Sequence, residues 1–526
     1  IPRAARAAKH VGAAEWIEAT AADRVSDHAE ILVHHYEQAL ELASAAGQDP
    51  DSRLQACLAR FLILAGDRAL RLDMAAAEMS YRRALELSGD SPARPALLVK
   101  LGDALNEQGR LPEAEHTYED AVDALRAAGD DRAAARGMVG LVRALWRHGQ
   151  TSRARELIYE AIPILEHDRG PDLLLAYERA ALVDTIGGRS QEGLRWAEKG
   201  LALGRELGVE NVVRHLQFQG LARLDLGDVS GLDDQREALE LSLRLGLGIE
   251  TATSYLNLGE SVAPYEPLAS ARELIEASLE FARRRGLQHH EMWTRSSRLW
   301  LLYELGEWDD LLREGDELLD WDRSIGGGTQ IAVNVLMIAG PALAQRGDAD
   351  EAQRYAATFL PRAREIGDPQ MLGPALVFGA VIQAINGKLG EATSLLADFG
   401  GAQSQYASWP GGGFADCFRV CVAAGDLDLG EQLLAASGNA IPNLANRATR
   451  AGGRAIFAEA RGAMDEAAAL YREAVSGWTE WGSVVERGNA LLGLGRCGDE
   501  DAARAGAAIF EQLRARPFIA RAPRED

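Results

Sequence analysis

The residue types that most often carry chemistry are sparse in this sequence, and their spacing does not favour a site. Cys417 and Cys421 are four residues apart, which places both thiols on one side of a helix. A zinc site would need two further ligands, and no histidine lies near them in sequence, so we expect buried thiols. The pairs His34–His35 and His289–His290 point in different directions on a helix and cannot chelate one ion alone. We therefore expect no metal and no cofactor.

Glycine-rich and acidic segments give no catalytic motif either. The chain has no G-x-x-x-x-G-K-[ST] phosphate loop, because Gly387-Lys388 lacks both the upstream glycine and the following hydroxyl residue. Residues 493–498 fit G-x-G-x-x-G, but no strand is expected before them, so we interpret them as a helix terminus. Carboxylate pairs such as Asp233-Asp234 lie at turns and helix starts, where they favour the helix dipole. We expect this chain not to be an enzyme.

Composition narrows the classes of partner. The chain has 526 residues, a net charge of −23, 47% hydrophobic residues and 4 cysteines. So few cysteines cannot form a disulfide framework, which favours a reducing, cytoplasmic location. The acidic balance argues against nucleic acid and anionic membranes as partners. The most apolar stretch, Ile331 to Leu343, is too short to span a bilayer. At roughly 150 residues per domain, the length alone suggests three or four domains.

An internal repeat indicates one long array of similar units in place of three or four separate domains. The segment LGDALNEQGRLPEAEHTYEDAVDAL, from Leu101, has a helical pattern, a break at Gly109 and a second helical pattern from Pro112. It predicts a helical hairpin. The break recurs with a period of about 39 residues. The equivalent positions are Asp73, Gly109, Gly149, Gly188, Gly227, Glu266, Gly306, Gly347, Gly387, Gly425, Gly462 and Gly498.

A small residue recurs five positions after each break from Gly109 onward. Nine of the eleven residues there are Ala or Gly, which allows the second helix to approach the first closely. The positions are Ala114, Ala154, Gly193, Leu232, Ala271, Leu311, Ala352, Ala392, Gly430, Ala467 and Ala503.

With this unit, the segments at Leu101, Ala339–Leu360 and Arg454–Val475 resemble tetratricopeptide repeats. They share a Leu-Gly or Ala-Gly pair in the first helix, the turn glycine, the small residue after the turn, and an aromatic or small residue four positions further on (Tyr118, Ala356 and Tyr471). The resemblance covers roughly residues 50–515 and implies an all-α fold, an α-solenoid (superhelix) of about twelve helical hairpins. Some units depart from the pattern. Asp184 and Arg223 stand where a bulky apolar residue is expected, Glu266 replaces the turn glycine, and SQYASWPGGG at 404–413 is a candidate bend.

Before the array, the pattern predicts two helices, one through Trp16 and Ile17 and one from about Asp27 to Ala45, with Asp27 and Glu30 at capping-box spacing. The runs His10…Trp16-Ile17-Glu18 and Ala29-Glu30-Ile31-Leu32…His34-His35-Tyr36 resemble the stretch that follows the nucleotide-binding module of large bacterial signalling ATPases.

That resemblance implies a division into a connector at 1–48, the repeat array at 49–515 and a tail at 516–526. The chain starts at Ile1 rather than Met, so we expect a fragment, the sensor end of a longer protein. Members of that family often carry a class III adenylate or guanylate cyclase domain at the N-terminus, and others carry a DNA-binding domain at the C-terminus. No helix-turn-helix follows Arg514, which favours the cyclase type.

The resemblance also places candidate binding residues. In tetratricopeptide arrays the first helix of each hairpin lines the concave groove, and positions six and three residues before the turn face it. Arginine and aromatic side chains at such positions anchor interfaces. The alternative is that these large side chains pack between hairpins. The candidates are Arg136, Arg143, Trp146 and Arg147 in one unit, and Trp293, Trp300 and Tyr303 in another.

The sequence therefore predicts a non-catalytic interaction and sensor region in bacterial signal transduction. A protein, peptide or small inducer would bind in the groove and regulate an ATPase or cyclase module in cis. Three alternatives remain: a stand-alone repeat scaffold, the sensor region of a transcriptional regulator, and an enzyme with an unrecognised site in the groove. A cluster of strongly perturbed titratable groups in one pocket would favour the last of these.

Overall fold

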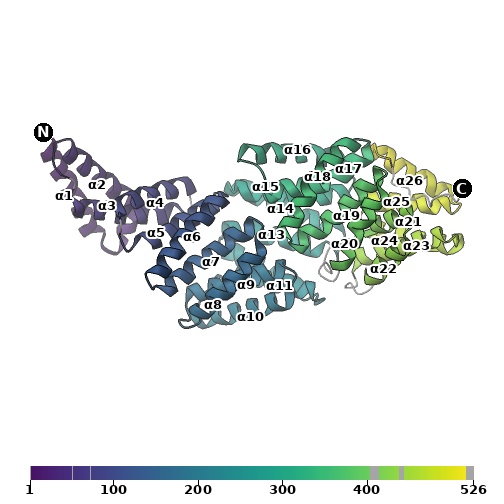
Figure 1. Cartoon of the computed structure of the whole chain (residues 1–526), viewed down its shortest axis with the longest axis horizontal. Helices are drawn as coiled ribbons and strands as arrows, with labels where there is room; N and C mark the ends of the chain where they lie inside the picture. Colours follow the sequence, from purple (N-terminus) through teal and green to yellow (C-terminus); the bar gives the residue numbers. More distant parts are fainter. Residues whose placement is uncertain are drawn as a thin grey trace. The chain divides into compact units, whose positions relative to one another are not determined.

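The computed structural model describes residues 2–49, 51–70, 73–89, 91–402, 414–437 and 443–516. The candidate bend at 404–413 and nearly all of the tail at 516–526 lie outside these ranges. Within them the chain is α-helical without strands, and it forms two compact units, residues 1–179 and 180–526 (Figure 1). None of the helices in these ranges has the length and apolar content needed to cross a membrane.

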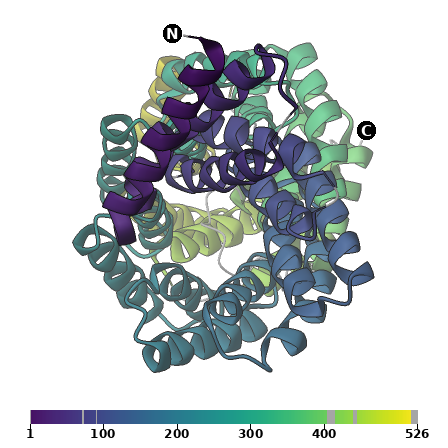
Figure 2. The same cartoon turned by 90° about the vertical axis from the view of Figure 1, so that its left-hand side faces the viewer.

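The first unit is built from consecutive antiparallel helices, each packed on the next in chain order (Figures 1 and 2). Its elements are α1 (Arg3–Ala21), η1 (Ala22–His28), α2 (Ala29–Ser44), α3 (Ser52–Ala69), α4 (Met74–Ser88), α5 (Arg94–Glu107), α6 (Leu111–Ala127), α7 (Asp131–Arg147), α8 (Thr151–Leu165) and the start of α9 (Pro171–Ile186).

The second unit continues the same alternation. Its helices are the end of α9, α10 (Ser190–Leu207), α11 (Val213–Asp225), α12 (Gly231–Arg244), α13 (Gly248–Val262), α14 (Leu268–Arg285), α15 (Gln288–Glu304), α16 (Trp308–Ser324), α17 (Gln330–Arg346), α18 (Ala349–Ile366), α19 (Pro369–Ile385), α20 (Leu389–Ala402), α21 (Phe414–Ala424), α22 (Leu427–Ser437), α23 (Leu444–Ala460), α24 (Met464–Trp481), α25 (Val484–Arg496) and α26 (Glu500–Leu513).

The predicted turns are confirmed. Each of the twelve positions from Asp73 to Gly498 lies between the two helices of a hairpin, from α3–α4 to α25–α26. At Gly109 the backbone has φ +77°, a left-handed conformation that side chains other than glycine rarely adopt. The amides of Gly109 and Arg110 then close the end of α5 by donating to Asn106 O and Leu105 O. Twelve repeat hairpins, α3–α4 to α25–α26, therefore lie in the described residues, as the repeat predicts, and α1–α2 precede them.

A tyrosine between glycines joins neighbouring hairpins. Tyr118 of α6 is buried, and its ring lies so close to α5 and α7 that a Cβ at Gly102 or Gly140 would be 2.8 Å or 2.6 Å from it. Its hydroxyl donates to Asp103 of the same hairpin. Tyr81 repeats the arrangement against Gly66. The glycine in the first helix is thus required by the aromatic ring of the second.

The small residues after the turns lie against the first helix as predicted: Ala114, Ala154 and Ala271 are at 0% exposure, and the half-buried Ala503 lies against Gly495 of α25. The Leu232 unit reaches the same contact one residue earlier. There a Cβ at Gly231 would be 2.3 Å from the Gly220 carbonyl oxygen, so a glycine is needed at that position instead. Close approach of the two helices is therefore kept even where the repeat register shifts.

The residues that depart from the repeat are compensated locally. Asp184 is completely buried and accepts a hydrogen bond from Trp196 Nε1 at 3.2 Å. Arg223 pairs with Asp234 at 2.8 Å. The turn at Glu266 uses a longer loop, residues 263–267, with no positive φ, so glycine is not needed there.

At the N-terminus the two predicted helices are confirmed as α1 and α2, but the predicted capping box is wrong. Asp27 lies in the 3-10 segment η1, and α2 begins only at Ala29. The Asp27 carboxylate instead accepts from Arg24 Nε at 3.0 Å and from Arg68 Nη1 at 3.2 Å. The competing arginines explain why it does not cap the helix.

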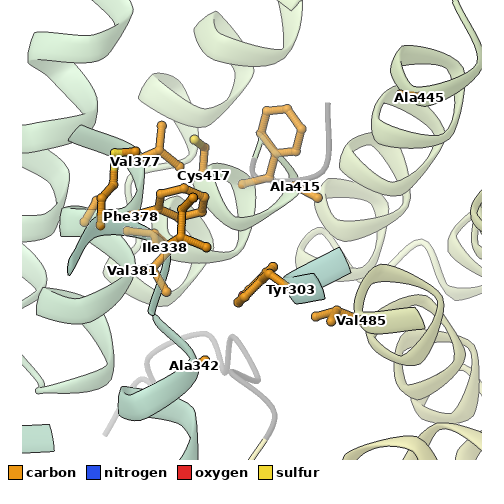
Figure 3. Packing of buried hydrophobic residues seen from close by; sticks show 14 of the residues in the cluster. Tyr303, Ile338, Ala342, Val377, Phe378, Val381, Ala415, Cys417, Ala445 and Val485 are labelled. Carbon is orange, nitrogen blue, oxygen red and sulfur yellow. The ribbon is translucent and has the colours of Figure 1, made fainter. Parts of the chain in front are cut away.

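The second unit closes on itself, which the repeat pattern alone does not show. Trp481 Nε1 at the end of α24 donates to Ala263 O at 2.7 Å, 218 residues away, and Ser483 Oγ donates to Glu304 Oε2 at 2.6 Å. Arg346 Nε donates to Leu513 O at 3.1 Å. The last hairpins of this unit therefore lie against its earlier ones. Figure 3 shows labelled side chains of six first helices (α15, α17, α19, α21, α23 and α25) in one apolar cluster.

Candidate functional site

Three predicted residues, Arg143, Trp146 and Arg147, lie together on α7, the first helix of its hairpin, beside α5 of the preceding hairpin. We call this surface of α5 and α7 the first-helix face; it carries Asp103, Asn106, Glu107, Arg143, Trp146 and Arg147. Direct packing of α5 on α7 places these side chains side by side. Arg143 Nη1 pairs with Glu107 Oε1 at 2.7 Å, with the two side chains 28% and 22% exposed. The face is therefore charged but only partly open to solvent.

Arg147 is the most strongly desolvated cation of this face. Burial, and then the neighbouring charge of Arg143, lower its pKa to about 10. Its Nη1 donates to both the backbone and the side-chain oxygen of Asn106. Beside it, burial raises the pKa of Asp103, and the Glu107 charge adds to the shift. These shifts indicate a low-dielectric surface, on which electrostatic contacts are stronger than in water.

Trp146 adds an unused donor to the same face. Its side chain is partly exposed, while Nε1 is buried and has no hydrogen-bond partner in the part of the chain that the structure describes. Arg136, by contrast, is exposed and pairs with Asp172 of α9, at 3.0 Å from its Nε. Arg143, Trp146 and Arg147 are thus brought together, and Arg136 is held in a separate ion pair.

The second group of predicted binding residues, Trp293, Trp300 and Tyr303, lies in two different environments. Trp293 and Trp300 are partly exposed and pack on the edge of the apolar core. Tyr303 lies inside that core (Figure 3), stacked on Trp308 at 5.3 Å between ring centroids, and its hydroxyl accepts from Gln345 Nε2 at 3.2 Å. Tyr303 therefore contributes to packing in this structure. Trp293 and Trp300 are the partly exposed residues of this group.

A buried ionic cluster inside the second unit was not found from the sequence. Arg419 of α21 bonds to Asp416 and to Glu486 of α25, and all three residues are between 4% and 7% exposed. Burial raises the pKa of nearby Glu304 to about 8. These groups hydrogen-bond to one another and to Ser483 within the packed core, so their perturbed pKa values have a structural cause. Arg419 lies six residues before the turn residue Gly425, a position that the repeat predicts to face the groove. This spacing is the sequence signal by which Arg419 could have been found.

The structure also shows the surroundings of the two cysteines of α21 and of the glycine-rich residues 493–498. Cys417 and Cys421 are buried, as predicted, and burial raises the pKa of the Cys421 thiol to about 12. Residues 493–498 form the end of α25 and the following turn, which confirms a helix terminus. Over the described ranges, no three His, Cys, Asp or Glu side chains are grouped so that they could hold a metal ion.

Comparison with known proteins supports the repeat assignment. Residues 93–167, the hairpins α5–α6 and α7–α8, match the family described as Tetratricopeptide repeat. A search of curated proteins finds no matching relative.

Among solved structures, the Rap protein complexed with competence and sporulation factor is 14% identical, with a TM-score of 0.48, over 69% of this chain and 98% of that one. The APC/C hetero-tetramer Cut9–Hcn1 is 15% identical, with a TM-score of 0.45, over 86% of each chain. A STAND protein with a tetratricopeptide repeat sensor from Pyrococcus horikoshii is 14% identical, with a TM-score of 0.33, over 72% of this chain and 52% of that one. The family match at residues 93–167 and the helices of the described residues show a tetratricopeptide-repeat region within an all-α array of helical hairpins.

Proposed function

We propose that this chain is a non-catalytic sensor region. It binds a protein or peptide on the first-helix face of its first unit and regulates an ATPase or nucleotide cyclase module of the same polypeptide. In this proposal residues 1–48 connect to that module, residues 49–515 form the sensing array, and residues 516–526 are a tail. The observation that carries the binding part is the set Arg143, Trp146 and Arg147 on adjacent turns of α7.

The physical argument is that polar groups on this face are already desolvated before a ligand binds. Trp146 Nε1 is a desolvated donor, and an unpaired buried donor destabilises a protein by about 1–3 kcal/mol. A rotation of the indole that uncovers Nε1 would let a peptide carbonyl accept from it and remove that penalty. Arg143 and Glu107 present one charge of each sign in a partly desolvated setting, so they select a partner by electrostatic complementarity. Tryptophan and arginine are also the residues most enriched in binding hot spots.

Regulation follows from the mechanics of a repeat array. Each hairpin of the first unit contacts mainly its neighbours, so a ligand that bridges α5 and α7 changes the angle between two hairpins. The change is passed along the stack through α3 and α4 to the connector helices. Small-angle scattering with and without the ligand measures this change. An unchanged radius of gyration at saturation contradicts the mechanical part of the proposal.

The binding part is tested with a displayed peptide library selected on the full chain. We expect selected peptides to slow amide hydrogen exchange in α5 and α7. Trp146→Leu should weaken their binding at least tenfold, since hot-spot truncations remove about 2 kcal/mol or more. Trp16→Leu is the matched control, because Trp16 is 67% exposed on α1, away from this face. Equal affinities for the two variants would place the binding site elsewhere.

The cis-regulation part is tested by the gene upstream of Ile1. A phosphate loop within the preceding few hundred codons is expected, and the selected peptide should then change nucleotide hydrolysis or cyclase activity of the complete protein. An upstream region without a phosphate loop would favour a stand-alone scaffold.

A further inference from the structure

Helix α23 carries three arginines on one exposed side. Arg447, Arg450 and Arg454 are spaced by three and four residues, so they share one side of the helix, with Cβ atoms about 5–6 Å apart between neighbours. All three side chains are exposed, while the residues that separate them in sequence are all buried. We call these three residues the arginine strip of α23.

Other hairpins bury the positions that this strip occupies. Arg454 stands where Leu101 and Ala339 stand in their repeats, and both of those are buried. Arg450 lies twelve residues before the turn residue Gly462, and its equivalents are buried in ten other hairpins. These equivalents are Phe61, Leu97, Gly137, Ala176, His215, Ser254, Thr294, Val335, Ala375 and Glu486. Helix α23 thus exposes arginines at positions that the array otherwise uses for packing.

The residue equivalent to Arg450 normally packs on the second helix of the preceding hairpin. In α7 it is Gly137, where a Cβ would lie 3.0 Å from Val122 of α6. In α11 it is His215, whose ring a Cβ at Gly200 of α10 would overlap. The second helix that precedes α23 is α22, which has 11 residues, whereas α24 has 18. A short α22 explains why this side of α23 is not fully covered.

Helix α22 lies along only the C-terminal part of α23. A Cβ at Gly453 would be 3.0 Å from Leu434 of α22. Arg461, which is on the same side of α23 as the arginine strip, forms an ion pair with Glu431 near the start of α22. These contacts make the two helices antiparallel, and α22 ends at Ser437. A longer α22 would continue beside the arginine strip.

The arginine strip has no counter-ion in the part of the chain that the structure describes. None of its guanidinium groups there lies within 4.0 Å of a carboxylate, and residues 438–442, which link α22 to α23, contain no charged side chain. Arginine binds carboxylates through paired N–H donors, so the strip is complementary to an acidic partner. The net charge of −23 opposes long polyanions such as nucleic acids and anionic membranes, but a short acidic segment brings few charges.

We propose that the arginine strip binds an acidic helical segment of a partner protein, which lies beside α23 as a second helix does in the other hairpins. Glutamates or aspartates three or four residues apart on that segment match the spacing of the three arginines. The inference goes beyond the proposed function, because the strip is a second interaction surface, in the second unit, and does not depend on the first-helix face. A basic segment would be repelled by the strip.

The test uses the full chain and two labelled helical peptides that differ only in charge. One is acetyl-ALEALAEALAELA-amide, whose glutamates share one side of the helix, and the other has glutamine in place of each glutamate. We expect fluorescence anisotropy at low ionic strength to show about tenfold tighter binding of the glutamate peptide, as several exposed ion pairs together would give. The preference should shrink at high salt, because the arginines are exposed to solvent.

Variants separate a local effect from a general one. Arg450→Gln should lower the preference for the glutamate peptide several-fold, and adding Arg447→Gln and Arg454→Gln should abolish it. The matched control is Arg244→Gln, which removes an exposed arginine of α12 that also forms no ion pair among the described residues; it should keep the preference. Unchanged hydrogen exchange in α23 and α24 verifies that each variant is folded.

Each contrary result overturns a definite part. Equal affinity of the wild-type protein for the two peptides, or no binding of either at millimolar concentration, overturns the acidic partner. An equal loss in Arg450→Gln and Arg244→Gln overturns the arginine strip as its site. Tighter, Arg450-dependent binding of an oligothymidylate or of phosphatidylserine vesicles overturns a protein segment as the ligand. None of these results affects the peptides selected on the first unit, whose dependence on Trp146 decides the proposed function separately.

Discussion

Removing Arg419 should open the second unit, because this side chain holds two buried carboxylates from different hairpins. Its Nε and Nη2 donate to Asp416 Oδ1 at 3.0 and 2.7 Å, and its Nη1 donates to Glu486 Oε2 at 3.0 Å. Asp416 and Glu486 are 5% and 4% exposed. Arg419→Ala leaves both without their cation in the core, and breaking such a buried pair destabilises proteins by about 3–5 kcal/mol.

The effect should be local and is best measured locally, because a repeat array does not unfold as one two-state unit. Amide hydrogen exchange read by mass spectrometry reports the opening of α21 and α25 separately. A loss of about 3–5 kcal/mol corresponds to exchange faster by roughly a hundredfold or more. The matched control is Arg313→Ala, whose ion pairs with Asp310 and Glu317 lie on the surface and contribute about 0–1 kcal/mol.

The ionic cluster of Arg419, Asp416 and Glu486 also predicts how the loss of stability in Arg419→Ala depends on pH and on a second substitution. Burial raises the pKa of Glu486, and without Arg419 that carboxyl can be accommodated only by taking up a proton. The Arg419→Ala variant should therefore be closer to wild type at pH 5 than at pH 8. Glu486→Gln should destabilise the wild type but restore part of the stability of the variant. Equal exchange in Arg419→Ala and Arg313→Ala would refute this account of the closure.

Two further predictions concern packing and titration. Gly140→Ala should lower the melting temperature, because its Cβ would lie 2.6 Å from the Tyr118 ring and overpacking destabilises by about 1–3 kcal/mol. Gly12→Ala, where nothing lies within 4 Å of the new Cβ, should leave it unchanged or raise it. The carboxyl of Glu304 has a pKa of about 8 in the folded chain and its ordinary value near 4.5 when unfolded, so the native state retains a proton that the unfolded state releases. Amide hydrogen exchange of α15, corrected for the intrinsic pH dependence of exchange, should show a local stability that decreases from pH 5 to pH 8. Glu304→Gln should flatten that dependence, and an unchanged slope would contradict it.

The repeat could be predicted because its contacts are local. A turn such as Gly109, a small residue such as Ala114 and an aromatic such as Tyr118 all serve one hairpin and its immediate neighbour. These requirements recur with the same spacing in every unit, so a single sequence contains many copies of the same signal. Even Asp184 and Arg223, which break the pattern, are compensated within about a dozen residues.

The repeat pattern in the sequence predicts only part of the candidate site. The register places Arg143 and Trp146 on the first-helix face, where the structure has them, and their role in binding stays a prediction. It also assigns Tyr303 to a groove, although the structure buries Tyr303 against Phe378 of α19. A one-dimensional repeat specifies which side of a helix a residue occupies. It does not specify whether that side faces solvent or another part of the same unit.

The sequence by itself determined the hairpin, its period and its small-residue contacts, because each depends on residues that are close in the chain. Only the tertiary structure decided that the second unit closes, since its curvature is the sum of many small rotations between hairpins and no single repeat encodes that sum. Closure brings Arg419 to Glu486, 67 residues apart, and Trp481 to Ala263, 218 residues apart. It also fills the interior with apolar side chains, which gives the buried charges their perturbed pKa values.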